Sequence, residues 1–570
     1  MERTTMTLWM MKNTCFLESH RSHVRARVGL ARFFLIFCFL LRLASWLSST
    51  ITSRRVESQL NSLPFLLPST TPTPSPFTSL PLSFLLFFPL SSLTSHANRV
   101  SKGEKSYSGL TSSLPSPSPS PSSWTTKFSS AQPLILFPSN SLFPTTTMSS
   151  PAQLDTSNRE MTINLGAGPS CLPTEVLLQA AQGIIDYERT GMGLVELSHR
   201  SSTFIKVVKS AEADLRQLLA IPEDYAVLFQ QGGGTEQFTA TALNLLAAHA
   251  VKNPDYMSQN PRGPPCDYAI TGSWTSKALK EAKRMGANVN VVVDSRKEQG
   301  ADSKFGCIPP VSTWKLSPVE SKPAFLYYCD NETVEGVEFP SPGLAFDQLP
   351  EEYRKTVPIV ADCSSNILSR PIDVKAHSII FFGAQKNVGP SGVTIVIVRK
   401  DLIVDPDQGV PNGGPRVPTT LVYKNAADNG SLYNTPPTFA IYATGLVLRD
   451  LLENKGGVQG AAQRSENKSR AVYQTIASSN GIFVPSVRQQ EVRSRMNITF
   501  RVCRPGGPPD EELEERFVKK CSEKGITQVK GHRSVGGIRT SLYNAITEEQ
   551  TQVLVQVMKT FIDEISEEAK

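Results

Sequence analysis

The sequence predicts an α/β protein in which a large domain with a mostly parallel sheet precedes a smaller α+β domain. Over residues 161–456, short and nearly continuous apolar runs alternate with segments of helical periodicity, as expected for parallel strands covered by helices on both faces. Over residues 457–570 the order becomes helix, strand, helix, strand, helix, which is typical of a separate α+β unit. A chain of 570 residues is long enough for two folded domains.

The elements of the large domain follow from its apolar patterns. A helix is predicted at Thr203–Ala220, a strand at Tyr225–Phe229 and an Ala- and Leu-rich helix at Phe238–Ala250. Five further apolar runs predict strands at Val289–Val293, Ala324–Cys329, Val357–Ala361, Ser378–Phe382 and Val393–Val398. The stretches Lys252–Pro265 and Asp405–Pro418 have the composition of surface insertions.

The smaller domain is predicted from five patterns near the C-terminus. They are a helix at Ser469–Ser478, a strand at Met496–Val502, a helix at Glu511–Lys524, a strand at Gly537–Tyr543 and a long last helix from Thr547.

Residues 1–147 do not have the composition of a folded domain. Fourteen of the 42 prolines lie there, many in Ser/Pro/Thr-rich runs, and such sequence buries too little apolar surface to offset the entropy of ordering it. We therefore expect a disordered leader. Because Met148 stands just before the folded part, the leader is either an over-extended gene model or a targeting segment, mitochondrial by its Arg- and Ser-rich composition. The apolar run Phe33–Leu41 is too short to span a bilayer, which disfavours a membrane anchor.

The net charge of +7 belongs to this leader. Through Thr147 there are 13 basic and 4 acidic residues, a net charge of +9, whereas the other residues have 45 and 47, a net charge of −2. A near-neutral folded part argues against nucleic acid as a partner. The nine cysteines show no paired CxxC spacing, so we expect no metal site and no disulfide scaffold, but free thiols in a reducing compartment such as the cytoplasm.

Two residues at predicted strand ends carry the strongest chemical signal. Asp362 follows one strand, and Lys386 stands just past the glycine that ends the next. Ligands bind at the carboxyl ends of strands in α/β sheets, and a desolvated lysine there has a lowered pKa and a nucleophilic amine. The pair suits pyridoxal phosphate, whose ring nitrogen needs a carboxylate and whose aldehyde needs a lysine. Taken alone, Asp362 is equally well a turn residue, and an isolated lysine is usually solvated.

Other residues suggest anion binding. Gly232–Gly234 and Thr235 lie between a strand and a helix, where backbone N–H groups approach a phosphate. Trp274 is a candidate to stack on a planar ring, although a lone tryptophan is more often a core residue. The pairs His199-Arg200 and His532-Arg533, with Arg539, suggest a substrate with two anionic groups, although spacing alone favours solvated or ion-paired residues.

Together these motifs resemble the phosphoserine aminotransferase family, class-V aminotransferases of the fold-type-I pyridoxal phosphate enzymes. The resemblance runs in order from Ile163 to Glu568 and leaves out residues 1–147. The matching stretches are Asn164–Pro169, Glu196–Arg200, Gln231–Phe238, Asn331–Gly336, Ala361–Val374, Gly383–Pro390, Tyr433–Phe439 and Lys530–Asn544.

The resemblance implies a role for each matching position. Lys386 would be the Schiff-base lysine, Asp362 the partner of the ring nitrogen, Trp274 the stacking residue and Thr333 a hydrogen-bond partner near the ring oxygen. The cofactor phosphate would be held by Gly234, Thr235 and Gln385, and by Asn434 and Thr435 from the neighbouring subunit of a homodimer. The substrate phosphate would be bound by His199, Arg200, His532 and Arg533, and the α-carboxylate by Arg539. Some family members have a basic residue in place of Thr235, so that auxiliary phosphate contact is absent here.

The implied reaction is reversible amino transfer between O-phospho-L-serine and 2-oxoglutarate, as in L-serine biosynthesis. Three alternatives stay open: an aminotransferase for an uncharged amino acid, a non-catalytic protein of the same fold, and a membrane-tethered protein. The two His-Arg pairs disfavour the first, and the complete set of chemical positions disfavours the second. A side activity on phosphohydroxythreonine also stays open.

Overall fold

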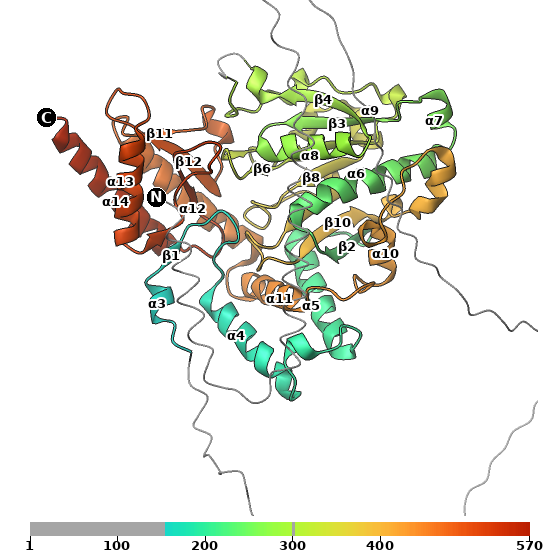
Figure 1. The fold of residues 1–570 in the computed structure, drawn as a ribbon, viewed down its shortest axis with the longest axis horizontal. Coiled ribbons are helices and arrows are strands. Elements are labelled where there is room, and N and C mark those ends of the chain that lie inside the picture. Colours follow the sequence, from blue (N-terminus) through green and yellow to red (C-terminus); the bar gives the residue numbers. More distant parts are fainter. Residues whose placement is uncertain (1–153, 299–302) are drawn as a thin grey trace, which may run out of the picture. The chain divides into compact units, whose positions relative to one another are not determined.

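The computed structural model describes residues 154–298 and 303–570, so the predictions for the leader lie outside the described residues. At its centre is a seven-stranded sheet of order β2-β10-β9-β8-β5-β3-β4 (Figure 1). Strand β10 is antiparallel to both of its neighbours, and the other neighbours are parallel. The strands are β2 (Tyr225–Gln230), β3 (Pro265–Ile270), β4 (Asn288–Asp294), β5 (Phe325–Cys329), β8 (Ile359–Asp362), β9 (Ile379–Gly383) and β10 (Thr394–Arg399). The predicted α/β fold with a mostly parallel sheet is confirmed.

Helices cover both faces of this sheet. Residues of β9 alternate between two hydrophobic cores, because successive side chains of a strand point to opposite faces. Ile379 and Phe381 pack with residues of α6 (Gly233–Lys252) and α8 (Ser273–Arg284). Ile380 and Phe382 share the other core with residues of α5 (Ser202–Leu219) and α11 (Thr438–Glu453). Burial on both faces explains why the strands read as continuous apolar runs.

A third hydrophobic core lies in the C-terminal part, drawn in red in Figure 1. It packs the antiparallel strands β11 (Phe483–Pro485), β12 (Asn497–Val502) and β14 (Ile538–Ser541) against helices α12 (Gly457–Ala477), α13 (Glu511–Glu523) and α14 (Glu548–Glu568). The N-terminal strand β1 (Ile163–Asn164) pairs with β13 (Ile526–Thr527), so residues near 163 join this core. The domain limits 161–456 and 457–570 stay a prediction.

Several elements have no counterpart in the predictions. They include α4 (Thr174–Ile185), β3, α8 and α11. Strand β3 contains Asp267, which interrupts the apolar run but is buried and accepts hydrogen bonds from Ser317 and Tyr353. Helix α12 begins twelve residues before the predicted start at Ser469, because its first half is polar.

The two stretches predicted as insertions lie against each other. The first contains the short helix α7 (Tyr256–Gln259), and the second a 3-10 helix at Pro406–Asn412. Asn412 donates a hydrogen bond to the carbonyl of Ala250, so both stretches pack at the end of α6. Among the described helices none is long and apolar enough to cross a membrane.

Lys468 of α12 gives a test of how the C-terminal core is held. The side chain is 1% exposed, and its Nζ donates hydrogen bonds to the carbonyls of Leu542, Tyr543 and Ile546 at 3.0, 2.8 and 2.7 Å. Lys468→Met leaves these three buried acceptors without their donor, so we expect the free energy of unfolding to fall by about 3 kcal/mol. Urea denaturation measures it, with the exposed Lys519→Met as control. A loss no larger than that of the control contradicts this role.

Candidate active site

The site begins at the carboxyl ends of the parallel neighbours β8 and β9. Asp362 is the last residue of β8 and is 5% exposed, and Lys386 lies in the turn after β9. Burial raises the pKa of Asp362, and the Lys386 ammonium opposes that shift. Burial likewise lowers the pKa of Lys386, with the Asp362 carboxylate opposing it. Each group therefore stabilises the charged form of the other.

Thr333 joins Lys386 to the C-terminal part of the chain. The Nζ of Lys386 donates to Thr333 Oγ1 at 2.7 Å, and Nη1 of Arg539 donates to the Thr333 carbonyl at 3.3 Å. Arg539 lies on β14, and burial lowers the pKa of its guanidinium. Thr333 therefore accepts hydrogen bonds from both the predicted Schiff-base lysine and the predicted carboxylate-binding arginine.

Residues 168–170 pack against the turn that contains Lys386. A Cβ at Gly168, where φ is +130°, would lie 3.2 Å from Cγ of Lys386, so this close approach needs glycine. The backbone N–H of Ser170 donates to the carbonyl of Gln385 at 2.9 Å. The side chain of Gln385 folds back over Gly383.

Two buried glutamates cap the start of α8, where Trp274 lies. Glu332 accepts hydrogen bonds from the N–H groups of Trp274 and Thr275 at 2.8 and 2.9 Å, and Glu335 accepts from Ser273. Burial, together with the neighbouring Glu335, raises the pKa of Glu332 to about 8. These carboxylates orient the helix start and hence the Trp274 ring, whose centre is 5.6 Å from Lys386 Nζ. We did not predict either glutamate, since nothing in their spacing marks them.

The glycine triplet forms the start of α6 beside Asp362. Gly232 and Gly233 have φ of +87° and +69°, which glycine adopts without strain. A Cβ at Gly234 would lie 3.9 Å from Oδ2 of Asp362, so the helix start faces the site. Thr235 follows in the first turn. The α6 N-terminus therefore offers backbone N–H groups and a favourable dipole to an anion near Asp362.

The loop before β14 brings His532 and Arg533 toward Arg539. The Nδ1 of His532 accepts the N–H of Ser534 at 3.2 Å, which leaves Nε2 of the neutral ring to carry the proton. Burial lowers the pKa of His532, and the positive charges of Arg539, Lys277 and Arg533 lower it further. Arg533 is exposed.

The structure does not bring every predicted site residue to Lys386. Arg200 is exposed and shares a hydrogen bond of 3.3 Å with His199. In residues 154–298 and 303–570, no hydrogen bond or ion pair joins this pair to Lys386 or Arg539. Asn434 and Thr435 are also exposed. Gln231 donates to the Thr435 carbonyl, and Asn434 lines a cavity of about 320 Å³ that also borders Gly232.

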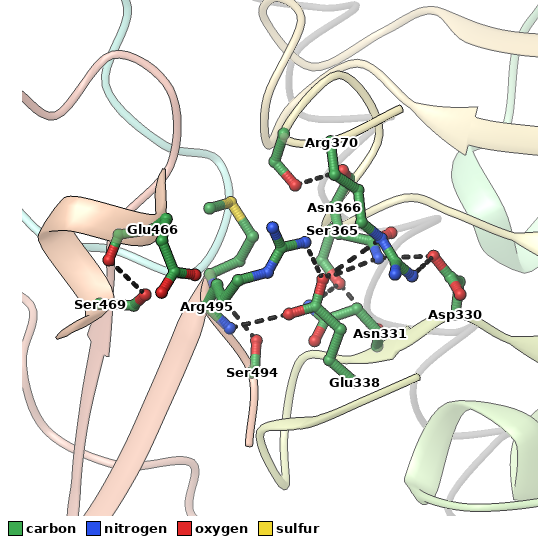
Figure 2. Close-up of polar contacts among 12 residues, drawn as sticks. Asp330, Asn331, Glu338, Ser365, Asn366, Arg370, Glu466, Ser469, Ser494 and Arg495 are labelled. Atoms are coloured by element: carbon green, nitrogen blue, oxygen red, sulfur yellow. Dashed lines mark hydrogen bonds and ion pairs between the residues drawn. The ribbon is translucent and has the colours of Figure 1, made fainter. Parts of the chain in front are cut away.

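A buried ion network holds the loop that follows Asp362 (Figure 2). Arg370, 4% exposed, donates to Asp330 Oδ2 at 2.5 Å, and its Nε is 3.8 Å from Glu338. Glu338 also accepts two hydrogen bonds from Arg495, which precedes β12. Burial would raise the pKa of Glu338, but the guanidinium groups of Arg495 and Arg370 outweigh it and hold that pKa below its usual value. The network therefore ties the Asp362 loop to the C-terminal core.

Comparison with known proteins identifies the family. The model of the class-V aminotransferases matches residues 162–554. The chain belongs to this family. It is 44% identical over 404 residues to "Phosphoserine aminotransferase" of Drosophila melanogaster, covering 70% of this chain and 98% of that protein. It is 41% identical over 407 residues to "Phosphoserine aminotransferase 1, chloroplastic" of Arabidopsis thaliana, covering 71% and 83%.

Solved structures agree with this family. The phosphoserine aminotransferase of Bacillus circulans subsp. alkalophilus has a TM-score of 0.58 and 38% identity, covering 70% of this chain and 98% of that one. The pyridoxal-phosphate-bound phosphoserine aminotransferase of Trichomonas vaginalis has a TM-score of 0.57 and 35% identity, covering 70% and 99%. The cofactor of this aminotransferase is pyridoxal phosphate.

The residues at the site fit this cofactor. A buried carboxylate and a desolvated lysine face each other, and the start of α6 offers N–H groups to a phosphate beside them. The Trp274 ring lies 5.6 Å from Lys386 Nζ, so a planar ring linked to that lysine can stack on the indole, whose buried Nε1 has no hydrogen-bond partner among the described residues.

The raised pKa of Glu332 predicts how the stability of the folded protein depends on pH. The folded state keeps the proton of Glu332 up to about pH 8, whereas an unfolded glutamate loses it near 4.5, so the stabilisation from this proton is lost as pH rises between these values. Glu332→Gln removes the titrating group. We expect the thermal midpoint to fall less with pH, over this interval, in the variant than in the wild type.

The slope with pH is the diagnostic quantity, because Glu332→Gln also loses hydrogen bonds and lowers stability at every pH. Glu320→Gln, a change of an exposed glutamate, is the control and should leave the slope unaltered. Equal slopes for Glu332→Gln and the wild type would show that Glu332 is ionised in the folded protein.

Proposed function

We propose that this protein is a phosphoserine aminotransferase that exchanges an amino group between O-phospho-L-serine and 2-oxoglutarate, giving 3-phosphohydroxypyruvate and L-glutamate, in L-serine biosynthesis. The observation that carries this proposal is the joint contact of Lys386 and Arg539 with Thr333, next to the cationic loop of His532 and Arg533. The names of the relatives at 44% and 41% identity support the choice of substrate.

The side chains divide the chemistry among them. Bound pyridoxal phosphate supplies a ring that accepts the electron pair released at the substrate Cα. Asp362 keeps the ring nitrogen protonated, Trp274 packs on the ring face, and Gly234, Thr235 and Gln385 hold the phosphate end. Arg539 binds the substrate α-carboxylate with its planar guanidinium. The Lys386 amine, whose pKa is lowered by burial, takes the proton from the substrate Cα.

Substrate selection rests on the distal anion. Phosphoserine and glutamate both have a second anionic group beyond the α-carboxylate, so one cationic site at His532 and Arg533 serves both substrates in turn. An uncharged amino acid such as alanine offers nothing to these residues. This argues against the alternative of an aminotransferase for uncharged substrates.

We also propose a homodimer in which a second copy completes the site. His199, Arg200, Asn434 and Thr435 have matching roles in substrate or cofactor binding, but within the described residues no hydrogen bond or ion pair joins them to Lys386, and the last three are exposed. Large apolar side chains are exposed on α4 and on the segment that leads from it to His199 and Arg200: Leu178, Ile184, Ile185, Met192 and Val195. A patch of this kind is typical of a protein interface.

The proposed location is the cytoplasm. All seven cysteines in the described part of the chain are unpaired, as in a reducing compartment. Organelle import is the competing proposal, and the N-terminal sequence of the mature protein distinguishes the two.

The central test is Lys386→Ala. Without the amine, we expect turnover of phosphoserine to fall by at least about 10³-fold, because both the covalent link to the cofactor and the proton transfer are lost. Borohydride reduction of the wild-type holoenzyme should leave a pyridoxyl group on the Lys386 peptide in mass spectrometry. Lys375→Ala, at an exposed lysine, is the control. An adduct on another lysine, or retained turnover, would sink the assignment.

The dimer proposal is tested at Ile185, which is 74% exposed. Ile185→Asp places a charge in the apolar patch. We therefore expect the molar mass measured by sedimentation to fall from that of a dimer to that of a monomer, with loss of phosphoserine turnover. Val484→Asp, at an apolar residue 41% exposed on β11, should leave the dimer intact. A wild-type protein that sediments as one copy and is active contradicts the proposal.

A further inference from the structure

Lys277 is a cation at the site that none of the motifs or comparisons assigns. It lies on α8, one turn after Trp274, and its Nζ is 4.0 Å from the centre of the Trp274 ring. Lys386 Nζ is 5.6 Å from the same ring, so the two amines lie within about 10 Å of each other. Lys277 is therefore a neighbour of the reacting lysine although it comes from another element.

The ammonium of Lys277 forms no ion pair with the carboxylates of the described residues. In residues 154–298 and 303–570 it has no hydrogen bond and no carboxylate within ion-pair distance, and the side chain is exposed. The nearby Glu335 carboxylate already accepts two hydrogen bonds from Ser273. The contact of Lys277 with the part-buried Trp274 ring is a single cation–π interaction, and the exposed, flexible lysine can leave the ring when an anion arrives.

Positive charge gathers around this amine. His532 and Arg533 lie on the loop before β14 and Arg539 lies on β14, and after burial the charges of Arg539, Lys277 and Arg533 all lower the pKa of His532. In the proposed function Arg539 takes the α-carboxylate and Lys386 the Cα proton. The phosphorus of phosphoserine is three bonds from that Cα, and Lys277 Nζ lies within about 10 Å of Lys386 Nζ across the Trp274 ring, so a long lysine side chain can approach the phosphate.

We propose that Lys277 is a substrate-binding residue that contacts the distal phosphate of the substrate together with His532 and Arg533. The inference rests on the proposed function, because it needs a substrate with a distal anion. A lysine ammonium acts as a point charge with three rotatable donors, so it follows a phosphate without a fixed geometry. A dianionic phosphate gains more from an added positive charge than a monoanionic carboxylate does. Lys277 therefore favours phosphoserine over glutamate.

The test compares Lys277→Met with Lys280→Met, which removes an exposed lysine from the same helix that has no contact with Trp274. We expect Lys277→Met to raise the KM for phosphoserine about fivefold at low salt, and that for glutamate less than about twofold, with kcat little changed. The constant for competitive inhibition by inorganic phosphate should rise by the same factor. High salt should reduce the difference, and Lys277→Arg should restore binding.

Arg533→Ala separates failure of this inference from failure of the proposed function. Should Lys277→Met behave like Lys280→Met while Arg533→Ala weakens phosphoserine selectively, Lys277 is no substrate contact and the proposed function stands. Should neither variant distinguish phosphoserine from serine, the choice of substrate itself is wrong. An equal loss of kcat for both substrates, with an altered absorbance of the bound cofactor, would instead assign Lys277 to positioning of Trp274 and overturn the inference.

Discussion

The active site depends on two carboxylates buried between hydrophobic cores. Asp330 and Glu338 are 2% and 3% exposed, and a buried charge is tolerated only when partners neutralise it and satisfy its hydrogen bonds. Arg370 pairs with both carboxylates and Arg495 with Glu338 from the other side (Figure 2), while Asp330 Oδ1 and Arg370 Nη1 have no hydrogen-bond partner among the described residues. Arg370 belongs to the loop after Asp362, and Arg495 precedes β12, so the two carboxylates hold the central sheet and the C-terminal sheet together. Loss of one member of such a group costs about 3–5 kcal/mol, which makes this junction rigid.

That rigidity explains how Arg539 is placed. Strand β14 pairs with β12 in fixed register, with Arg539 opposite Thr499. Asn497 of β12 accepts a hydrogen bond from Asn331, two residues from Thr333. The position of β12 therefore sets both the strand that carries Arg539 and the segment that carries Thr333. The spacing of Lys386 and Arg539, the proposed proton-transferring amine and the proposed carboxylate-binding guanidinium, is therefore a consequence of sheet register and one buried polar network.

The strands of the central sheet other than β3, and the two strand-end residues, could be predicted from the sequence, because both follow from local patterns. Continuous apolar runs mark buried parallel strands, and Asp362 and Lys386 follow two such runs directly. Contacts between residues that are distant in the sequence could not be predicted. Lys386 and Thr333 are 53 residues apart, and Arg539 is 206 residues from Thr333, with no periodicity to connect them. The role of Thr333 and the assignment of Arg539 to the α-carboxylate came from the resemblance alone. Strand β3 was missed because Asp267 is buried by partners that lie 50 and 86 residues further along.

The burial of each site residue agrees with its proposed role. Asp362 and Thr333, which we propose to contact the cofactor, are buried and hydrogen-bonded, and a resident group needs one geometry. Arg200, Arg533 and Asn434 are exposed. In the proposed function, residues that bind the substrate exchange water for an anion in each half of the reaction, and residues that complete the site of a second copy lie at the surface before assembly. The proposed site therefore has a fixed part, built by the sheet, and an adaptable part, built by loops and, in the proposed homodimer, by the second copy.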